Sequence, residues 1–452
     1  MKGRRVALLG MARSGLAAAR LCLREGARPI CLDLKRPAES EEAVRSLEEA
    51  GARFIWGPHP LEALEGLERI ITSPGVPGDI EFLTKAREQG IPIWSELELA
   101  GRFARGPIYG ITGTNGKSTT AAWTADMLGR CGRAHELVGN IGRPISDGVL
   151  HGEPGAVLVT EISSFQLEET EAFRPASAAL LNLTADHLDR HGDLGGYREA
   201  KMRIFRNQTE EDCAVVGEQE DLAGEVARRF RCRLLRFRLE DRGEEGASIR
   251  EGRLLVRLGG VERILCGAGE LSLPGAHNRS NALAALALLA PLGLPEDGLN
   301  DSLRRFPGLP HRLETIASVA GVRYVNDSKA TNTDSLMTAL HAYDVALILL
   351  AGGRGKQQDF RPLAGTVRER CRTVVLFGEA AGEIRAAWGG ELCEVVADLA
   401  EATRRARDLA RPGEIVLLSP ACASFDQFRN YEERGERFRY LVRELARDME
   451  DR

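Results

Sequence analysis

Short apolar runs, each bounded by glycine, proline or charged residues, recur along the chain and define its secondary-structure pattern. The runs are rich in Val, Ile and Leu and alternate little with polar residues, which is typical of strands buried on both faces of a parallel sheet. We therefore predict strands at RRVALLG, ARPICLDL, LERIITS, GPIYGIT, GAVLVTEI, SAALLNL, DVALILLAG, RTVVLFG and GEIVLLS.

Most of these runs are separated by segments in which apolar residues recur at helical spacing. Examples are SGLAAARLCLREG, STTAAWTADMLGRCG, NRSNALAALALLAPLG and LAEATRRARDLA. Strands that alternate with helices in this way form parallel sheets covered by helices. The pattern predicts a doubly wound α/β fold.

The alternating pattern restarts twice along the 452 residues, so we expect three domains. The first series ends near Trp94, GPIYGITGTNGKST opens the second, and GVRYVNDSKATN opens the third after the proline-rich FPGLPHR. We predict α/β domains at residues 1–95, 96–307 and 308–452. Residues 213–266 are charged and strand-like, and no chemistry is evident in them.

Composition narrows the class of protein. The chain is 43% hydrophobic and 28% charged, and it has no apolar stretch of the roughly 18 residues that a membrane helix needs. Arg13 and the glycines around it interrupt the first apolar run, which predicts a strand rather than a signal peptide. Nine scattered cysteines without a C-x-x-C pair indicate a reducing compartment, the cytoplasm. A net charge of -5 gives no reason to expect nucleic-acid binding.

The segment PIYGITGTNGKSTT places a glycine-rich turn between a predicted strand and a predicted helix. Gly113 and Gly116 would let backbone N–H groups surround phosphate oxygens, while Lys117 supplies a cation and Ser118 a ligand for Mg²⁺. The spacing departs from the usual phosphate loop, because its first glycine lies at Gly110 rather than one residue later. A tight turn without a ligand is the alternative.

A second glycine-rich turn, GMARSG, follows the first predicted strand, and Asp33 closes the next strand. This arrangement is typical of a dinucleotide-binding loop. Ala12 replaces the glycine that normally admits a pyrophosphate, and Arg13 lies at the helix start, so a nucleotide diphosphate other than NAD fits as well or better. A turn without a ligand stays the alternative.

Acidic residues and histidines follow two predicted strands. Glu161 ends AVLVTE, where a carboxylate would face the phosphate loop and hold Mg²⁺. The segment TADHLDRH carries a candidate metal cluster of Asp186, His187, Asp189 and His191. The alternative for this segment is the start of a helix.

Three loops of the third predicted domain carry polar residues at strand ends. His311 and Arg312 precede the first of these strands, and NDSKATN ends it with Asp327, Ser328, Lys329 and Thr331. GGRGK and SPACASFDQF follow two further strands. Converging loops of this kind could hold a dicarboxylate and part of ATP, although each alone could be a plain connection.

Taken together, the motifs resemble those of the Mur ligase family over essentially the whole chain. The residues that carry the resemblance are GITGTNGKST, GNIG, TEISSFQLE, TADHLDRH, YREAK, HNRSNALAA, GLPHR, NDSKATNTDS, GGRGK and LSPACASFDQF. The resemblance implies an N-terminal Rossmann-like domain for a UDP-sugar, a central phosphate-loop ATPase domain and a C-terminal Rossmann-like domain for an amino acid. It implies a cytoplasmic monomer that joins D-glutamate to UDP-N-acetylmuramoyl-L-alanine through an acyl phosphate, releasing ADP and phosphate.

The resemblance also assigns roles to individual residues. UDP-substrate contacts fall on Arg13, Ser14, Asp33, Ser73, Asn140 and Ser163, and also on His187. ATP contacts fall on Gly113, Thr114, Asn115, Gly116, Lys117, Ser118, Thr119, Asn281, Arg312 and Asp327. D-glutamate contacts fall on Lys329, Thr331, Lys356, Ser424, Phe425 and Tyr431, of which Phe425 and Tyr431 stand where the family commonly has Leu and Phe.

Metal and catalytic roles follow in the same way. Two Mg²⁺ sites would use Ser118 with Glu161, and His187 with Lys201, the latter carbamylated by CO₂ in the family. The catalytic residues implied are Lys117, His187, Lys201 and Lys329.

Other functions are compatible with parts of the sequence. The N-terminal glycines alone would suit a nicotinamide-dependent oxidoreductase, and a nucleotide-sensing module would bind nucleotide without releasing ADP. Relatives that add L-alanine, diaminopimelate or lysine, or that extend folate with glutamate, share many motifs. The NDSKATN and SPACASFDQF loops favour D-glutamate.

Overall fold

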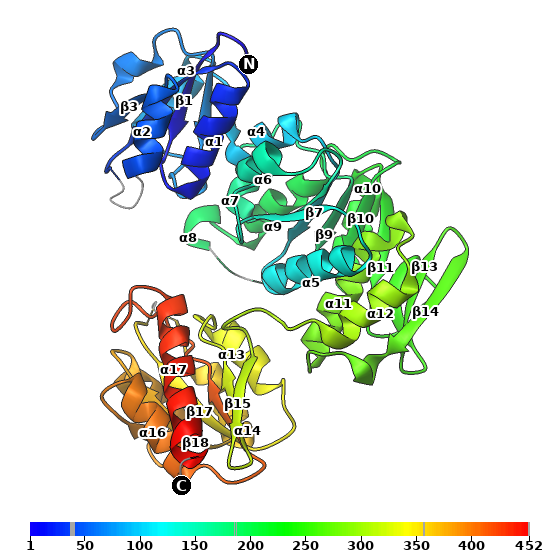
Figure 1. Ribbon diagram of the computed structural model, residues 1–452, viewed down its shortest axis with the longest axis vertical. Helices are drawn as coiled ribbons and strands as arrows, with labels where there is room; N and C mark the ends of the chain where they lie inside the picture. Colours follow the sequence, from blue (N-terminus) through cyan, green and yellow to red (C-terminus); the bar gives the residue numbers. More distant parts are fainter. Residues whose placement is uncertain (37–40, 185, 187, 356–357, 451–452) are drawn as a thin grey trace. The chain divides into compact units, whose positions relative to one another are not determined.

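The computed structural model describes residues 1–36, 41–184, 186, 188–355 and 358–450, and these form three β-sheets (Figure 1). The chain divides into two compact units, Met1–Ser272 with Arg279–Phe306, and Leu273–Asn278 with Pro307–Arg452. Two sheets belong to the first unit and one to the second. Among the described helices, none combines the length and apolarity that a membrane crossing requires.

The first sheet is parallel throughout, in the order β3-β2-β1-β4-β5. Its strands are β1 (Arg5–Leu9), β2 (Arg28–Asp33), β3 (Arg53–Trp56), β4 (Arg69–Thr72) and β5 (Ile93–Ser95). Its helices are α1 (Arg13–Arg24), α2 (Glu41–Glu49) and α3 (Glu81–Glu88). Because the strand order reverses beside β1, the loop after β1 lies where such sheets bind ligands.

The second sheet has the order β14-β13-β12-β11-β10-β9-β6-β8-β7 and is parallel from β7 to β12. Its strands are β6 (Ile108–Thr112), β7 (His135–Gly139), β8 (Val157–Glu161), β9 (Ser177–Leu180), β10 (Cys213–Val216), β11 (Arg233–Phe237), β12 (Gly246–Arg250), β13 (Arg253–Leu258) and β14 (Val261–Gly267). Strands β8, β6, β9 and β10 are neighbours, so the loops at their carboxyl ends meet at one edge.

Helices surround this second sheet and connect it to the first. Besides α1, α2 and α3, the first unit contains α4 (Glu96–Phe103), α5 (Lys117–Arg130), α6 (Ile145–His151), α7 (Ser164–Glu168), α8 (Leu188–His191), α9 (Leu194–Met202), α10 (Glu220–Arg229) and α12 (Glu296–Arg305), with most of α11 (Ala276–Leu289). Helix α4 follows β5 directly, and α1 packs against α4 and α6. The first two sheets therefore share a continuous apolar core.

The second unit contains the third sheet, in the order β15-β16-β20-β17-β18-β19. Its strands are β15 (Glu314–Val319), β16 (Val322–Asn326), β17 (Leu347–Gly352), β18 (Cys371–Phe377), β19 (Cys393–Val395) and β20 (Ile415–Leu418). Its helices are α13 (Thr333–Leu340), α14 (Ala364–Arg370), α15 (Ala381–Trp388), α16 (Leu399–Leu409) and α17 (Tyr431–Glu450). Among the described strands of this third sheet, only β15 runs antiparallel to its neighbour.

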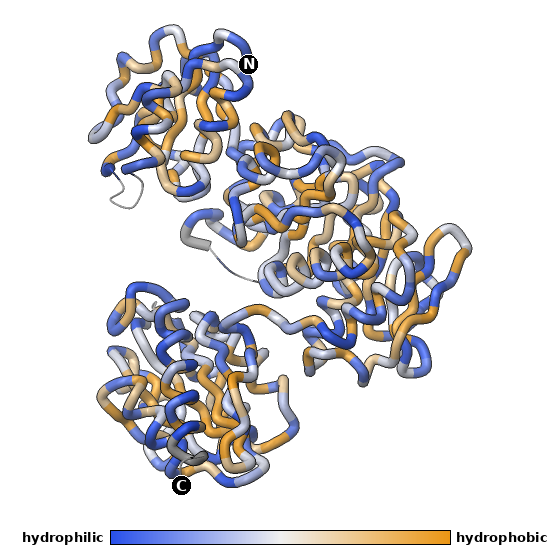
Figure 2. The backbone as a smooth tube through the Cα atoms, in the orientation of Figure 1, coloured by the Kyte–Doolittle hydropathy of each residue, from blue (hydrophilic) through white to orange (hydrophobic). Residues whose placement is uncertain are grey.

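The predicted α/β fold is confirmed, and all nine predicted strands are present in parallel pairs. Strands β6, β8 and β17 are buried along their whole length, which explains why most of their residues are apolar. Figure 2 shows hydrophobic segments, in orange, alternating with hydrophilic ones, in blue, in both units. The strands β3, β5, β7 and β19 were not predicted, because each is only three to five residues long and gives no extended apolar run. The two boundaries between the three predicted domains stay predictions, since the first compact unit includes two of the sheets.

We predict that Gly15→Ala lowers the melting temperature of the protein. A Cβ at Gly15 would lie well inside contact distance of the Gly10 carbonyl oxygen, so the first turn of α1 would have to move. Overpacking of this kind costs about 1–3 kcal/mol. Gly224→Ala is the matched control in α10, where only the flexible end of Arg228 is near and alanine favours the helix by about 1 kcal/mol. Differential scanning calorimetry of both variants measures the shifts, and an unchanged melting temperature for Gly15→Ala would contradict the prediction.

Candidate functional site

The phosphate loop joins β6 to α5 and folds around its own lysine. Gly116 precedes α5 with φ 84°, and a side chain there would collide with the amide oxygen of Asn281. The Lys117 ammonium donates to the carbonyl oxygens of Gly113 at 2.9 Å and Thr114 at 2.7 Å. A cation and the positive end of a helix therefore lie at the same loop, which suits a bound phosphate.

Asn182 and Thr184, which follow β9 along the chain, fix the conformation of this loop. The Asn182 side chain accepts from the Asn115 backbone N–H at 2.8 Å and donates to its carbonyl at 3.0 Å. The Thr114 hydroxyl donates to the Thr184 carbonyl at 3.1 Å and accepts from the Thr184 N–H at 3.0 Å. Sequence reasoning missed Asn182, which lies inside the run SAALLNL predicted as a strand, and Thr184, which directly follows this run.

Lys201, on α9, is buried beneath the same loop. Its ammonium donates to the Gly113 carbonyl at 2.9 Å, so it shares this acceptor with Lys117. Burial, together with the charge of Lys117, lowers the Lys201 pKa to about 7, while Asp186 and Glu161 oppose the shift. The contact of Lys201 with the phosphate loop was not predicted from the sequence, and its role as a carbamylated metal ligand stays a prediction.

Glu161, at the end of β8, is a second buried charged group at this edge. One carboxylate oxygen accepts from the Asn140 side chain at 3.0 Å, and the other has no hydrogen-bond partner among the described residues. A buried carboxylate oxygen without a donor is costly unless a cation meets it. This oxygen fits an Mg²⁺ ligand, because hard cations prefer carboxylate oxygens.

The segment TADHLDRH is described only in part, because His187 and the side chain of Asp189 lie outside the described residues, and its candidate metal cluster stays a prediction. His191, in the short helix α8, lies 3.0 Å from the Ser164 hydroxyl and 3.7 Å from Glu168, and it stacks on Phe165. The described residues contain no group of three His, Cys, Asp or Glu side chains that could hold a metal ion. The candidate ligand His187 lies outside the described residues, as does the D-glutamate candidate Lys356.

The N-terminal candidates gather at the loop after β1. Asp33 accepts from the Met11 N–H at 2.6 Å, and the Ser73 hydroxyl donates to the Gly10 carbonyl at 2.8 Å. Arg13 donates to the Gly142 carbonyl at 2.5 Å, next to Asn140. These contacts shape the loop itself, and the roles predicted for the side chains in binding a UDP-sugar remain predictions.

The other two UDP-substrate candidates also lie at element starts. Ser14 is in the first turn of α1. Ser163 precedes α7 and forms a capping box with Gln166, to which its hydroxyl also donates at 3.0 Å. The Ser163 hydroxyl is therefore already used by the fold.

In the second unit, Asp327 and Arg434 connect the loop after β16 with the segment after β20 by hydrogen bonds. Asp327 accepts from the Ser419 hydroxyl at 2.8 Å, and its burial raises its pKa to about 7. The Arg434 guanidinium is fully buried and donates to the Ser328 hydroxyl, the Ser328 carbonyl and the Cys422 carbonyl at 2.7–3.1 Å. Sequence reasoning missed Arg434, because charged residues crowd the start of α17 without distinction.

The candidate D-glutamate residues lie on the same loops. The Lys329 ammonium lies 5.0 Å from the centre of the Tyr431 ring. Ser424 is buried, Phe425 is 61% exposed, and Thr331 lies in the loop between β16 and α13. Of the remaining ATP candidates, Ser118 and Thr119 are buried in the first turn of α5, Asn281 lies 3.3 Å from the Thr120 hydroxyl, and the charge of Arg312 acts on Asp327.

Comparisons with known proteins cover nearly the whole chain. Family models described as Mur ligase MurD-like N-terminal domain, Mur ligase middle domain, and Mur ligase glutamate ligase domain match residues 4–95, 111–289 and 311–422. Proteins named UDP-N-acetylmuramoylalanine--D-glutamate ligase are similar in sequence. That of Pelotomaculum thermopropionicum is 41% identical over 98% of both chains, and that of Anaeromyxobacter dehalogenans is 43% identical over 99% of both.

Solved structures agree in fold. The MurF ligase of Thermotoga maritima in complex with ADP superposes with a TM-score of 0.61 and 17% identity, covering 99% of this chain and 96% of the other. The UDP-N-acetylmuramate-alanine ligase of the same organism gives 0.59 and 19% identity, covering 97% and 99%.

We predict that Lys201 reacts with acetic anhydride near neutral pH in CO₂-depleted buffer. A group with a pKa of about 7 is half neutral at that pH, and only the neutral amine attacks the anhydride. Mass spectrometry of tryptic peptides should show Lys201 modification rising with a midpoint near pH 7. Lys85 is the control, since its ion pair with Glu88 raises its pKa and keeps it protonated. A midpoint for Lys201 as high as that for Lys85 would contradict the assignment.

Proposed function

We propose that this chain, which belongs to the Mur ligase family, joins D-glutamate to UDP-N-acetylmuramoyl-L-alanine with ATP, releasing ADP and phosphate in peptidoglycan precursor synthesis. The relatives that carry this name match over nearly their full length. The observation that carries the proposal is the buried Glu161 carboxylate beside a loop on which two lysines share one carbonyl oxygen. Such a site is suited to a metal-bound polyphosphate.

The proposal assigns the substrates to three parts of the chain. Residues 1–95 would bind the UDP-sugar, residues 96–307 ATP, and residues 308–452 the amino acid. The loop after β1, the phosphate loop and the loops joined by Arg434 support these assignments. By its resemblance to the family, we place the protein in the cytoplasm as a monomer without nucleic-acid or membrane partners.

The residues of the central site would hold the reacting groups as follows. Glu161, Ser118, His187 and a carbamylated Lys201 would hold two Mg²⁺ ions, which when bound neutralise charge on the phosphates. Lys117 would orient the γ-phosphate for attack by the alanine carboxylate, giving ADP and an acyl phosphate. Lys329, Thr331, Lys356, Ser424, Phe425 and Tyr431 would hold D-glutamate so that its amine attacks the acyl carbon and phosphate departs.

Carbamylation of Lys201 has a specific electrostatic reason in this site. Two ammonium groups on the Gly113 carbonyl repel each other, and neither can donate a lone pair to a cation. The Lys201 ammonium first loses a proton to give the neutral amine. Addition of CO₂ to this amine forms an N–C bond and releases a second proton, so that overall one positive charge is replaced by a negative one. The product pairs with Lys117 and supplies oxygen ligands for a hard cation.

We expect ADP release to require UDP-N-acetylmuramoyl-L-alanine and D-glutamate together, at a rate at least about 100-fold above that with L-glutamate, because a site that fixes two carboxylates and an amine distinguishes enantiomers. A coupled ADP assay with L-alanine, lysine, diaminopimelate and both glutamates as amines measures this. Lys117→Ala should lose about 100-fold or more in kcat. Equal rates for the two glutamates would favour a folate-type ligase, and NADH turnover without ADP would favour an oxidoreductase.

We also expect Lys201→Ala to lose most activity and to recover part of it with formate or acetate. A small carboxylate can occupy the position of the missing carbamate, whereas Lys201→Arg should stay inactive because a guanidinium cannot react with CO₂. The loss should be about 100-fold. Lys85→Ala, a change at a surface ion pair, is the control and should stay fully active without added acid. Full activity of Lys201→Ala, or equal stimulation of all variants by formate, would contradict the carbamate.

A further inference from the structure

The segment from Asn182 to Thr184 is held by paired hydrogen bonds at every residue. Asn182 and Thr184 each exchange two bonds with the phosphate loop, as described above. Between them, the Leu183 N–H donates to the Gln219 side-chain oxygen at 2.9 Å, and the Gln219 amide nitrogen donates to the Leu183 carbonyl at 3.2 Å. The segment is therefore fastened to the phosphate loop on one side and to Gln219 on the other.

Gln219 lies between β10 and α10, directly before the first residue of the helix. A residue in this position usually caps its helix, but the Gln219 side chain makes no capping bond. Its amide instead exchanges two hydrogen bonds with the Leu183 backbone, as residues on paired strands do. The contact extends the β9–β10 pairing past the end of both strands.

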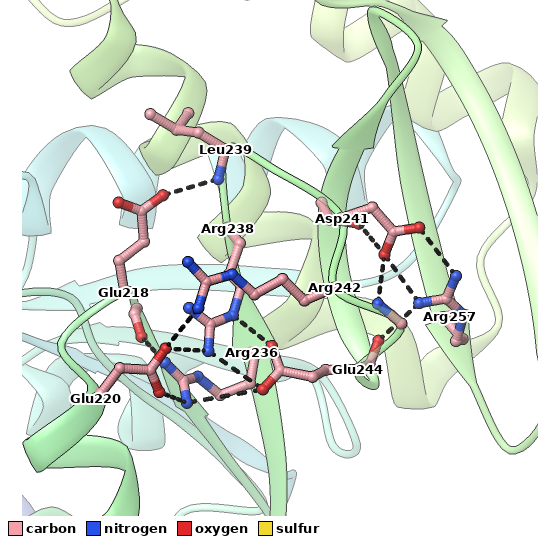
Figure 3. Close-up of polar contacts among 12 residues, drawn as sticks. Glu218, Glu220, Arg236, Arg238, Leu239, Asp241, Arg242, Glu244 and Arg257 are labelled. Atoms are coloured by element: carbon pink, nitrogen blue, oxygen red, sulfur yellow. Dashed lines mark hydrogen bonds and ion pairs between the residues drawn. The ribbon is translucent and has the colours of Figure 1, made fainter.

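The residues on either side of Gln219 are anchored by ion pairs and hydrogen bonds (Figure 3). Glu218 accepts from the Leu239 N–H at 2.9 Å. Glu220 pairs with Arg238 at 2.7 Å and with Arg236 at 3.2 Å, and both guanidinium groups are more than nine-tenths buried. Glu244 binds Arg238 from the opposite side. The residues on either side of Gln219 are thus fixed on β11 and on the residues that follow it, in the region where the sequence shows no chemistry.

The same start of α10 also braces the helix that carries Lys201. Arg198, one turn before Lys201 on α9, pairs with Asp221 at 3.0 Å and with Glu225 at 2.5 Å. The start of α10 therefore contacts two elements of the central site, α9 and the segment after β9. Displacement of either element would move a group that faces the phosphate loop.

We propose that Gln219 is a positioning residue for the ligation reaction, holding the segment from Asn182 to Thr184 against the phosphate loop. The expected effect of Gln219 on catalysis rests on the proposed function, whereas the contact between Gln219 and Leu183 does not. Gln219 touches no reacting group, and it acts through Leu183 on the loop contacts of Asn182 and Thr184. Loss of its amide would leave the buried Leu183 backbone groups without their partners and loosen the segment.

Gln208 provides a matched control at the opposite end of the same two strands. It is a buried glutamine whose amide donates to the Pro175 and Cys213 carbonyls, both at 3.0 Å, where β9 and β10 begin. Gln208→Met and Gln219→Met remove the same functional group from the same strand pair. A general loss of stability would affect both variants alike, whereas positioning of the phosphate loop concerns Gln219 alone.

The test combines hydrogen exchange with the Mg²⁺ dependence of ADP release. In Gln219→Met, the Leu183 and Thr184 amides should exchange about tenfold faster. The Mg²⁺ concentration for half-maximal kcat should rise about tenfold at an unchanged KM for D-glutamate. Gln219→Glu keeps the acceptor for the Leu183 N–H and should show a smaller increase in exchange. Gln208→Met should change neither measurement.

Two results would overturn the proposal. One is unchanged exchange at Leu183 and Thr184 in Gln219→Met, and the other is an equal rise in the Mg²⁺ requirement in Gln208→Met. A wild-type protein that releases no ADP with D-glutamate would instead refute the proposed function. The exchange comparison would still decide whether Gln219 holds the segment.

Discussion

The central site depends on a single backbone carbonyl, that of Gly113, which accepts from the ammonium groups of both Lys117 and Lys201. Like charges on one acceptor are tolerated only where negative charge is close, and here Glu161 and Asp186 act on Lys201. The arrangement follows from strand order. Strand β6 leads into the loop, its neighbour β8 ends in Glu161, and its other neighbour β9 leads into Asn182.

How far the sequence predicts this site depends on the kind of interaction involved. Strands β6, β8 and β9 were predictable because burial on both faces leaves continuous apolar runs, and the ends of parallel strands then bring Lys117 and Glu161 to one edge. Asn182 and Gln219 were not predictable, because a side-chain amide that binds a distant backbone leaves no periodic signal. Their partners, Asn115 and Leu183, are 67 and 36 residues away.

In the second unit, a charged residue that matters for the site was likewise not predictable from the sequence. Three strand-end loops were recognised from their polar residues, but what holds two of them is Arg434, which occupies a helix of alternating charges. A fully buried guanidinium is stable only if its donors find acceptors, and here two carbonyls and a hydroxyl provide them. The conformation of the proposed amino-acid loops is therefore determined by a residue outside every motif.

Asp327 in the second unit and Lys201 in the first change the stability of the protein with pH in opposite directions. Both changes border on pH 7. Asp327 has a folded pKa of about 7, above its unfolded value, so its burial lowers stability progressively as pH rises towards 7. Unmodified Lys201 has a folded pKa of about 7, below its unfolded value, so its cost is fully present below pH 7 and is relieved only above it. The destabilisation caused by burying Asp327 and Lys201 together is thus greatest near pH 7. The burial of these two groups does not stabilise the fold. Ligands that bind and neutralise them would raise the free energy of unfolding, as expected for residues that serve function.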